Sequence, residues 1–378
     1  MKELWMRIPP FLSDTFGFQE IMDVTDCLGI LDDCSPNKGI ASRLGARQYD
    51  LSGNMVATEI RMEDVVGGTG GKIEAKARQM LADNKPGCIM VGTGPASAMI
   101  GTDIESASAH IEMENGIPAS CVELTGHQFY DVGIGRTLEA MARLLVKPMQ
   151  KINGSCNILG GNVIDQGGNA TAIAEWLEDK GFTVLSRWGA SEKVKNMRQA
   201  AGASINLVTA AAGLPLAKYF HSTYGTPYLA AAPFGCSWAD RVHTALRTGE
   251  HLFPPTCGSP EILILGEQFT ANAIRETLQS EFHLQGIQVV TFFQLEKSLA
   301  APCDKRIKSE KELDALMGKG NYKLVIGAGE FKQFWNGQGR YFVLPHGATS
   351  VRSDERFPLL VGKALNTWLI TSGINEVH

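Results

Sequence analysis

Cysteine and histidine are the residues of this chain whose types allow metal, redox or acid–base chemistry. Eight cysteines occur, none of them in a Cys-x-x-Cys pair. Free cysteine packs as a small hydrophobe, so most of these thiols are expected in the core, and disulfides are improbable in a chain that looks cytosolic. Cys27 and Cys34 stand close together in a stretch rich in turn formers and are predicted as metal ligands facing one site. Burial of both as core thiols is the alternative.

A second candidate site follows the apolar run at residues 88–91, which predicts a buried parallel strand. Gly92, Thr93 and Gly94 then form a turn before a predicted small-residue helix over 96–110 that ends near Gly116. The free N–H groups of a helix that starts at a strand's carboxyl end can cradle a ligand or a cluster. We therefore predict that Gly92, Thr93 and Gly94 bind a cofactor.

His127 lies directly after the next predicted strand, in the pair Gly126-His127. Catalytic side chains of α/β proteins collect beyond strand ends, and imidazole exchanges protons near neutral pH. His127 is therefore the predicted catalytic residue, as a proton donor. A hydrogen-bonded structural histidine is the alternative.

Strand, glycine turn and helix recur along the chain and predict an α/β fold. Apolar runs at 157–159, 262–265 and 323–326 each precede glycine and a helical pattern. At 378 residues the chain exceeds what one core usually serves. With the proline-rich stretch at 254–260 as a linker, we predict domains at 1–150, 151–257 and 258–378. Residues 1–60 are irregular in pattern, and a helix over 358–371 closes the chain.

Composition narrows the class of protein. The hydrophobic content is 44% and the mean hydropathy is -0.05, with no apolar run near the roughly 20 residues of a membrane span. No signal peptide is recognisable, which predicts a cytoplasmic protein without a membrane partner. A net charge of -5 and no basic stripe argue against nucleic acid. The glycine turn at 67–71 lacks the Lys-Ser/Thr of a P-loop, so no nucleotide-binding motif is present.

Four stretches in order along the chain resemble the nitrogenase component 1 family, which includes protochlorophyllide and chlorophyllide reductases and the enzyme that reduces a nickel tetrapyrrole. The stretches are Val65-Val66-Gly67-Gly68, the segment 100–106, the segment 205–208 with the helix and Tyr224-Gly225-Thr226-Pro227-Tyr228 after it, and Phe357-Pro358-Leu359-Leu360-Val361-Gly362.

The resemblance implies three Rossmann-like domains with mainly parallel sheets around a central cleft. It also implies a homologous component 1 subunit as partner, in a homo- or heterodimer or tetramer. Electrons would arrive from an ATP-dependent iron–sulfur reductase through a cluster at the subunit interface, and substrate would be reduced in the cleft.

Cluster chemistry is where this chain departs from the family. Positions that carry cluster cysteines in the family correspond to Pro95 and Ala46, and the position of the cysteine that anchors the nitrogenase cofactor falls near Ala210. Only Cys27, with Cys34, lies where a first ligand is expected. Any iron–sulfur cluster would therefore be shared with a partner subunit or be absent.

Loss of the cofactor cysteine favours an organic or tetrapyrrole substrate. Gly126-His127 matches a Gly-His pair that presents histidine to the family's cofactor. Cys236 and Trp238 are the further predicted cofactor-binding residues, and Trp238 could line an apolar pocket with Trp188 and Phe234.

Three functions remain open on the sequence. The first is a nitrogenase-like oxidoreductase subunit for ATP-dependent, low-potential reduction of a cleft-bound substrate other than dinitrogen. The second is a non-catalytic scaffold or carrier in metallocofactor or tetrapyrrole assembly, which needs no electron-transfer cluster. The third, a sugar-nucleotide transferase or solute-binding protein, lacks an acidic metal motif and a secretion signal and ranks last.

Overall fold

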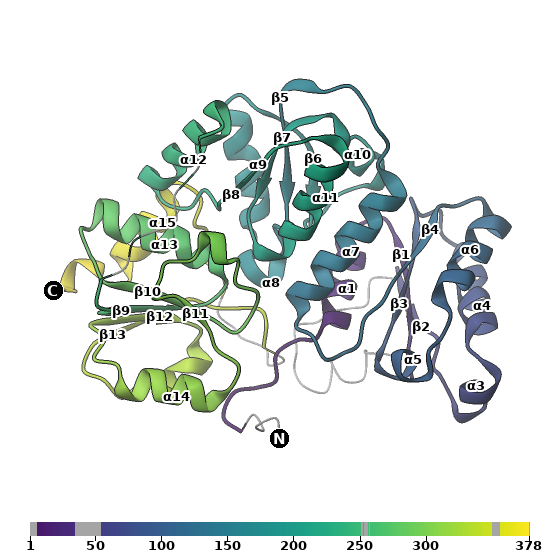
Figure 1. The fold of residues 1–378 in the computed structure, drawn as a ribbon, viewed down its shortest axis with the longest axis horizontal. Helices are drawn as coiled ribbons and strands as arrows, with labels where there is room; N and C mark the ends of the chain where they lie inside the picture. The colour runs from purple at the N-terminus through teal and green to yellow at the C-terminus, as the bar shows by residue number, and fades with distance from the viewer. Residues whose placement is uncertain are drawn as a thin grey trace.

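Three parallel sheets, one after another along the chain, define the architecture. The computed structural model describes residues 6–34, 54–250, 252, 256, 258–349 and 356–377. Each sheet lies in its own lobe in Figure 1, and each falls within one of the three predicted domain ranges. All strand pairs within the sheets are parallel, which confirms the predicted α/β class.

The first sheet is covered by helices on both faces. Across the sheet its strands are β2 (Met55–Ala57), β1 (Leu28–Asp32), β3 (Ile89–Thr93) and β4 (Ala119–Val122). Its helices are α1 (Asp14–Asp23), α3 (Met62–Gly67), α4 (Gly70–Leu81), α5 (Pro95–Ile100), α6 (Ile104–Asn115) and α7 (Tyr130–Leu145). Helices α4 and α6 close a small core of their own on one side, whereas α1 and α7 join the main core on the other.

The middle sheet runs β6 (Thr183–Trp188), β5 (Ile152–Leu159), β7 (Ala203–Val208) and β8 (Tyr228–Ala230), so β8 is an edge strand. Its helices are α8 (Val163–Gln166), α9 (Asn169–Asp179), α10 (Val194–Met197), α11 (Leu214–Tyr224) and α12 (Cys236–Thr248). Helix α11 also packs on α7, which places α7 between the first and middle sheets (Figure 1).

The last sheet runs β11 (Lys305–Arg306), β10 (Ile287–Thr291), β9 (Ile262–Leu265), β12 (Leu324–Gly327) and β13 (Arg340–Val343). Its helices are α13 (Gln268–Glu281), α14 (Glu310–Lys319) and α15 (Lys363–Thr371). Strands β9, β10 and β12 are buried along their whole length, as expected for parallel strands covered on both faces. No helix among the described residues is long and apolar enough to cross a membrane.

Three predicted elements differ in the structure. The helix predicted over 96–110 is two helices, because Gly101 takes φ +70° and ends α5, and the Asp103 side chain then caps α6. The irregular start contains α1, β1 and β2. The closing helix begins at Lys363 rather than 358, since Gly362 has φ +52° and residue 361 bridges Phe234.

Helices α1 and α7 approach each other closely because glycine from each lies against the backbone of the other. A β-carbon on Gly17 would lie 2.1 Å from the Tyr130 backbone oxygen, and one on Gly133 would lie 2.0 Å from that of Asp14. This contact fixes the first turn of α7, from which Tyr130 and Asp131 project into the centre of the molecule.

We expect Gly133→Ala to destabilise the fold by about 3 kcal/mol, because the added methyl group has to push two helix backbones apart. Gly71→Ala is the matched control, since its β-carbon would meet nothing within 4 Å in helix α4. Alanine there should be neutral or stabilise by about 0.5 kcal/mol. Urea denaturation of both variants measures the contrast, and equal effects would contradict the close helix approach.

Candidate functional site

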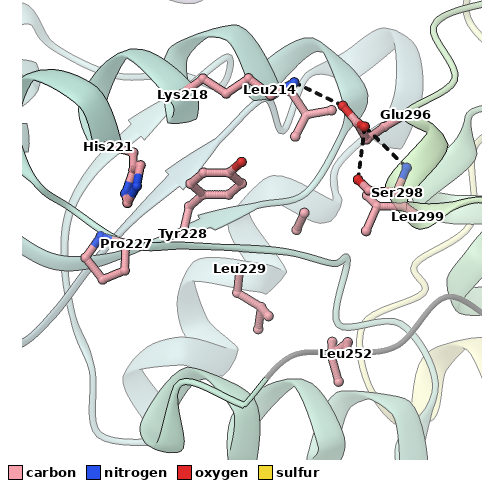
Figure 2. A pocket seen from close by; sticks show the side chains of 11 residues that line it. Leu214, Lys218, His221, Pro227, Tyr228, Leu229, Leu252, Glu296, Ser298 and Leu299 are labelled. Atoms are coloured by element: carbon pink, nitrogen blue, oxygen red, sulfur yellow. Dashed lines mark hydrogen bonds and ion pairs between the residues drawn. The ribbon is translucent and has the colours of Figure 1, made fainter.

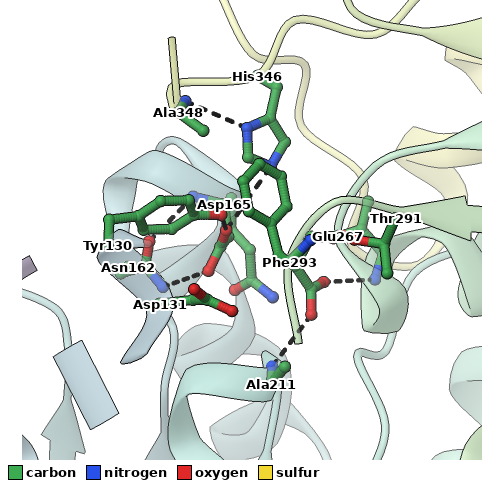
Figure 3. Close-up of polar contacts among 12 residues, drawn as sticks. Tyr130, Asp131, Asn162, Asp165, Ala211, Glu267, Thr291, Phe293, His346 and Ala348 are labelled. Carbon is green, nitrogen blue, oxygen red and sulfur yellow. Dashed lines mark hydrogen bonds and ion pairs between the residues drawn. The ribbon is translucent and has the colours of Figure 1, made fainter. Parts of the chain in front are cut away.

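Acidic, phenolic and imidazole side chains from helices and loops beside all three sheets meet at the centre of the molecule (Figure 3). Tyr130 comes from the start of α7, and Asp165 from α8, just after β5. Glu267 follows β9, and His346 follows β13. Carboxyl ends of parallel strands are where α/β proteins place ligands, and here the ends of β5, β9 and β13 supply three of the four groups. We call these four residues the junction cluster.

Asp165 is the centre of the junction cluster and is fully buried. Its Oδ1 accepts a short hydrogen bond from the Tyr130 hydroxyl, and its Oδ2 accepts one of 2.6 Å from the Asn162 side-chain amide. Asn162 in turn accepts the Asp165 backbone N–H at 2.9 Å, as the cap of α8. The carboxyl group is thus fixed in place by its neighbours.

His346 reaches Asp165 from the last sheet. Its Nδ1 accepts the Ala348 backbone N–H at 3.1 Å, which leaves the ring proton of the neutral imidazole on Nε2. Nε2 lies 3.6 Å from Asp165 Oδ1. The ring also stacks on Phe293, with centroids 5.1 Å apart and planes 12° from parallel. The imidazole N–H is therefore directed at the carboxyl group.

Burial sets the protonation of the junction cluster. It raises the pKa of Asp165 well above its ordinary value, and the nearby charge of Glu267 raises it further. Burial also raises the pKa of Glu267, but this carboxylate accepts backbone N–H groups from Ala211 and Thr270, which stabilise its ionised form. Hydrogen bonds from Tyr130 and Asn162 lower the pKa of Asp165, but burial and Glu267 outweigh them, so its net shift is upward. Burial and Asp165 raise the pKa of Tyr130 as well.

Buried polar atoms without a hydrogen-bond partner lie next to this cluster. Asp131 Oδ2 accepts the Gln294 backbone N–H at 2.8 Å, but its Oδ1 has no partner among the described residues. Gln166 Oε1 and Thr209 Oγ1 are likewise unpaired there. A β-carbon on Gly161 would lie 3.4 Å and 3.2 Å from these two atoms, so both face the same glycine at the ends of β5 and β7. Buried oxygen atoms without a hydrogen-bond partner could accept hydrogen bonds from a polar ligand.

Tyr130, Asp165 and His346 form a row of groups that can hold a proton. A neutral carboxyl, a phenol and an imidazole in one row are groups that general acids use. Sequence reasoning missed Tyr130, Asp165, Glu267 and His346. The signal that selected His127, a polar residue just beyond a strand end, also marks His346, which follows strand β13.

The structure places Cys27 and Cys34 at opposite ends of β1. Six residues separate them, and five of those form the strand at about 3.3 Å per residue, so the thiols lie roughly 20 Å apart. Cys27 is buried and Cys34 is exposed. The turn-rich pattern was misleading because its centre, Leu28–Asp32, pairs with β2 and β3. The two residues do not face one site.

Cys27 instead meets Cys88, with their sulfurs 3.0 Å apart and both side chains fully buried. The hydrogen bond with Cys27 and burial raise the pKa of the Cys88 thiol, so it stays protonated. No group of three or more His, Cys, Asp or Glu that could hold a metal occurs in the described part of the chain. The described residues therefore do not fit an iron–sulfur cluster held by this chain alone. Cys303 is disulfide-bonded, contrary to the expectation of free thiols. Ala46 lies outside the described residues.

The turn at Gly92, Thr93 and Gly94 is filled from within the protein. Thr93 Oγ1 donates to the Leu124 carbonyl and accepts the Leu124 N–H, at 2.6 and 2.7 Å. A β-carbon on Gly94 would lie 2.4 Å from the Asp33 carboxylate, which sits where an anion at the start of α5 would bind. The cofactor role predicted for this turn stays a prediction.

The remaining predicted residues are dispersed. His127 is exposed in the loop after β4 and does not belong to the junction cluster. The Cys236 N–H, at the start of α12, donates to Asn366. The Trp238 indole donates to the Ala232 carbonyl, and its ring is buried. Trp188 and Phe234 are buried in the core as well. The geometry gives these residues packing contacts and leaves their predicted ligand roles untested.

The fold and site define a class of protein with three parallel sheets around a central polar junction, and comparison with known proteins identifies its family. The family description "Nitrogenase component 1 type Oxidoreductase" matches residues 38–300. The chain belongs to this family, as the sequence resemblance predicted.

Individual relatives are distant. Two curated relatives are named nitrogenase iron-molybdenum cofactor biosynthesis protein NifE. The Methanosarcina barkeri protein is 25% identical over 250 residues, 62% of this chain and 52% of the relative. The Clostridium pasteurianum protein is 24% identical over 186 residues, which cover 48% of this chain and 40% of the relative. The matches span about half the length of these relatives.

Two solved structures share the fold. The structure described as nitrogenase Cp1 at pH 6.5 has a TM-score of 0.75 at 14% identity, covering 100% of this chain and 95% of that one. The structure described as nitrogenase Cp1 at pH 5 has a TM-score of 0.65 at 15% identity, and the match covers 88% of this chain and 82% of that one.

Protonation of Asp165 predicts a dependence of stability on pH. Because its folded pKa is raised, its contribution is fully present below the unfolded value of about 4 and is lost as pH rises towards the folded pKa. Asp165→Asn cannot ionise, so the variant's free energy of unfolding relative to wild type should rise with pH, by at most about 1.4 kcal/mol per unit. Urea denaturation from pH 4.5 to 8 measures this. Asp179→Asn, an exposed control, should give a flat difference.

Thiol accessibility gives a second prediction. Iodoacetamide at pH 7.5 should alkylate the exposed Cys34 in the native protein and leave Cys27, Cys88 and Cys156 unmodified. All four should react in urea. Peptide mass spectrometry measures the modification. Rapid native labelling of Cys27 would show that its thiol is open to solvent and would contradict the buried pair.

Proposed function

We propose that this chain is a cofactor-holding subunit in metallocofactor or tetrapyrrole assembly and carries no iron–sulfur cluster of its own. One observation carries the proposal: the buried thiols of Cys27 and Cys88 are paired with each other, and Cys34 lies at the far end of β1. Iron–sulfur clusters need a set of thiolates converging on one point. A subunit that only holds a finished or partly built cofactor has no such need.

The named relatives support a role in assembly. Both curated relatives are called cofactor biosynthesis proteins, and the chain matches about half of their length. The fold shared with nitrogenase structures supports the same general architecture. We further propose a homologous component 1 subunit as the partner, because members of such a family pair through related surfaces.

The junction cluster is the proposed binding place for the cargo. His346 would contribute its Nε2–H, and Asp165 with Tyr130 would hold a proton beside it. The unpaired Gln166 and Thr209 oxygens would bind polar groups of the cargo. Asp165 and Tyr130 are closed to solvent, so loading requires the sheets to separate around them.

A second candidate function is ATP-dependent reduction of a cleft-bound substrate, with an iron–sulfur reductase as electron donor and any cluster ligands shared with the partner subunit. The observation that favours it is the row of Tyr130, Asp165 and His346, since reduction of an organic substrate consumes protons as well as electrons. Turnover that requires both the reductase and ATP would distinguish this function from the carrier.

The first test measures iron, acid-labile sulfide and the ultraviolet–visible spectrum after anaerobic purification, with the chain alone and co-expressed with its genomic neighbour. We expect negligible iron on the chain alone. With the partner we expect a chromophore that His346→Ala loses and Cys27→Ala retains, because the imidazole faces the junction and the thiol does not.

Cys156→Ala is the control for loss of a buried thiol, since burial raises the pKa of Cys156 to about 12 and keeps it in the core. Thermal melts of all variants separate lost binding from lost folding. Stoichiometric iron and sulfide on the chain alone, lost in Cys27→Ala but not in Cys156→Ala, would overturn the carrier proposal.

A further inference from the structure

A cavity of about 460 Å³ lies between the middle and last sheets, away from the junction cluster (Figure 2). Leu214, Lys218 and His221 on α11, with β8, form one wall, and residues 296–299 after β10 form the other. Leu214, Leu229 and Leu299 give the cavity apolar surface. Its volume falls in the range of about 300–1,000 Å³ typical of small-molecule sites.

The wall formed by residues 296–299 is held rigidly. The Gln268 side chain accepts the Glu296 backbone N–H at 2.7 Å and donates to the Glu296 carbonyl at 2.9 Å. The Glu296 carboxylate accepts the Ser298 N–H and hydroxyl at 3.3 and 2.9 Å. These contacts fix both the backbone and the carboxylate at the cavity.

Lys218 brings a positive charge and free hydrogen-bond donors to this cavity. Lys218 Nζ lies 3.0 Å from Glu296 Oε2, and the lysine side chain is 58% exposed, so two of its three N–H bonds remain for a ligand. Glu296 is the main acceptor, and Lys218 and Ser298 already occupy it. Burial alone would raise the pKa of Glu296, but these donors outweigh burial and lower it.

The open edge of strand β8 presents two backbone N–H donors and two carbonyl acceptors, from Tyr228 and Ala230. The Pro227 carbonyl accepts the Asn206 N–H, and the Ala231 N–H donates to Val208, so alternate residues of β8 bond to β7. By this alternation the N–H groups of Tyr228 and Ala230 are directed away from β7, on the open edge of the sheet. The Tyr228 hydroxyl and the His221 ring are further donors without a hydrogen bond to any described residue.

We propose that this cavity binds a small apolar molecule that carries an oxyanion, with Lys218 as the residue that selects the charge. The leucines bury the apolar body, and Lys218 with the other N–H and O–H groups donates hydrogen bonds to the carboxylate, sulfonate or phosphate group. Glu296 competes with the ligand for Lys218, which keeps the lysine in place when no ligand is bound. This site is separate from the junction cluster and does not depend on the function proposed above.

The test uses two fluorescent probes of similar shape on the native full chain: 8-anilino-1-naphthalenesulfonate, an apolar anion, and N-phenyl-1-naphthylamine, its neutral counterpart. We expect saturable binding of the anion at one site. Lys218→Met should weaken it about fivefold, as loss of a partly exposed ion pair does. Glu296→Gln should strengthen it by a similar factor, because the competing carboxylate is removed. Neither variant should change binding of the neutral probe.

Two controls complete the test. Lys323→Met removes a lysine of similar exposure that pairs with Glu261 outside the cavity, and it should leave both probes unaffected. Leu299→Gln should weaken both probes, which places them at the apolar wall, and thermal melts show that each variant is folded. The proposal is overturned if Lys218→Met leaves anion binding within a factor of two of wild type, or weakens both probes equally.

Discussion

Burial of the Asp165 carboxyl group between three sheets is the constraint on which the centre of this protein depends. An ionised carboxylate in such a place would be costly, so the group keeps its proton and each neighbour supplies one contact. Tyr130 comes from the start of α7, Asn162 follows β5 of the middle sheet, and His346 follows β13 of the last sheet. The close approach of α1 and α7 also helps to position the contacts of Asp165, because it fixes the helix turn that carries Tyr130.

The thiols show how sheet geometry decides between a metal site and a core. Five residues of extended strand place Cys27 and Cys34 at opposite ends of β1. Parallel pairing of β1 with β3 brings Cys27 beside Cys88. A buried pair of thiols in which the pKa of Cys88 is raised has the properties of core packing rather than of a ligand.

Much of the fold could be predicted because buried parallel strands are short apolar runs that end in glycine, as at β3, β9 and β12. Helix α1 could not, since nearly all its residues are buried and it presents no polar stripe. The junction cluster could not be predicted either, because Asp165 and His346 lie far apart in the sequence and only the packing of separate sheets makes them neighbours. Strand β1 between Cys27 and Cys34 could not be predicted because turn-forming residues flank it on both sides.

The junction cluster and the cavity at Lys218 are connected by the start of α13. Glu267 belongs to the junction cluster and accepts the Ala211 N–H. The next residue, Gln268, forms two hydrogen bonds with the backbone of Glu296 in the cavity wall. Asp131 holds the same segment from the other side through the Gln294 N–H. Adjacent residues at the start of α13, Glu267 and Gln268, therefore contribute one to each site.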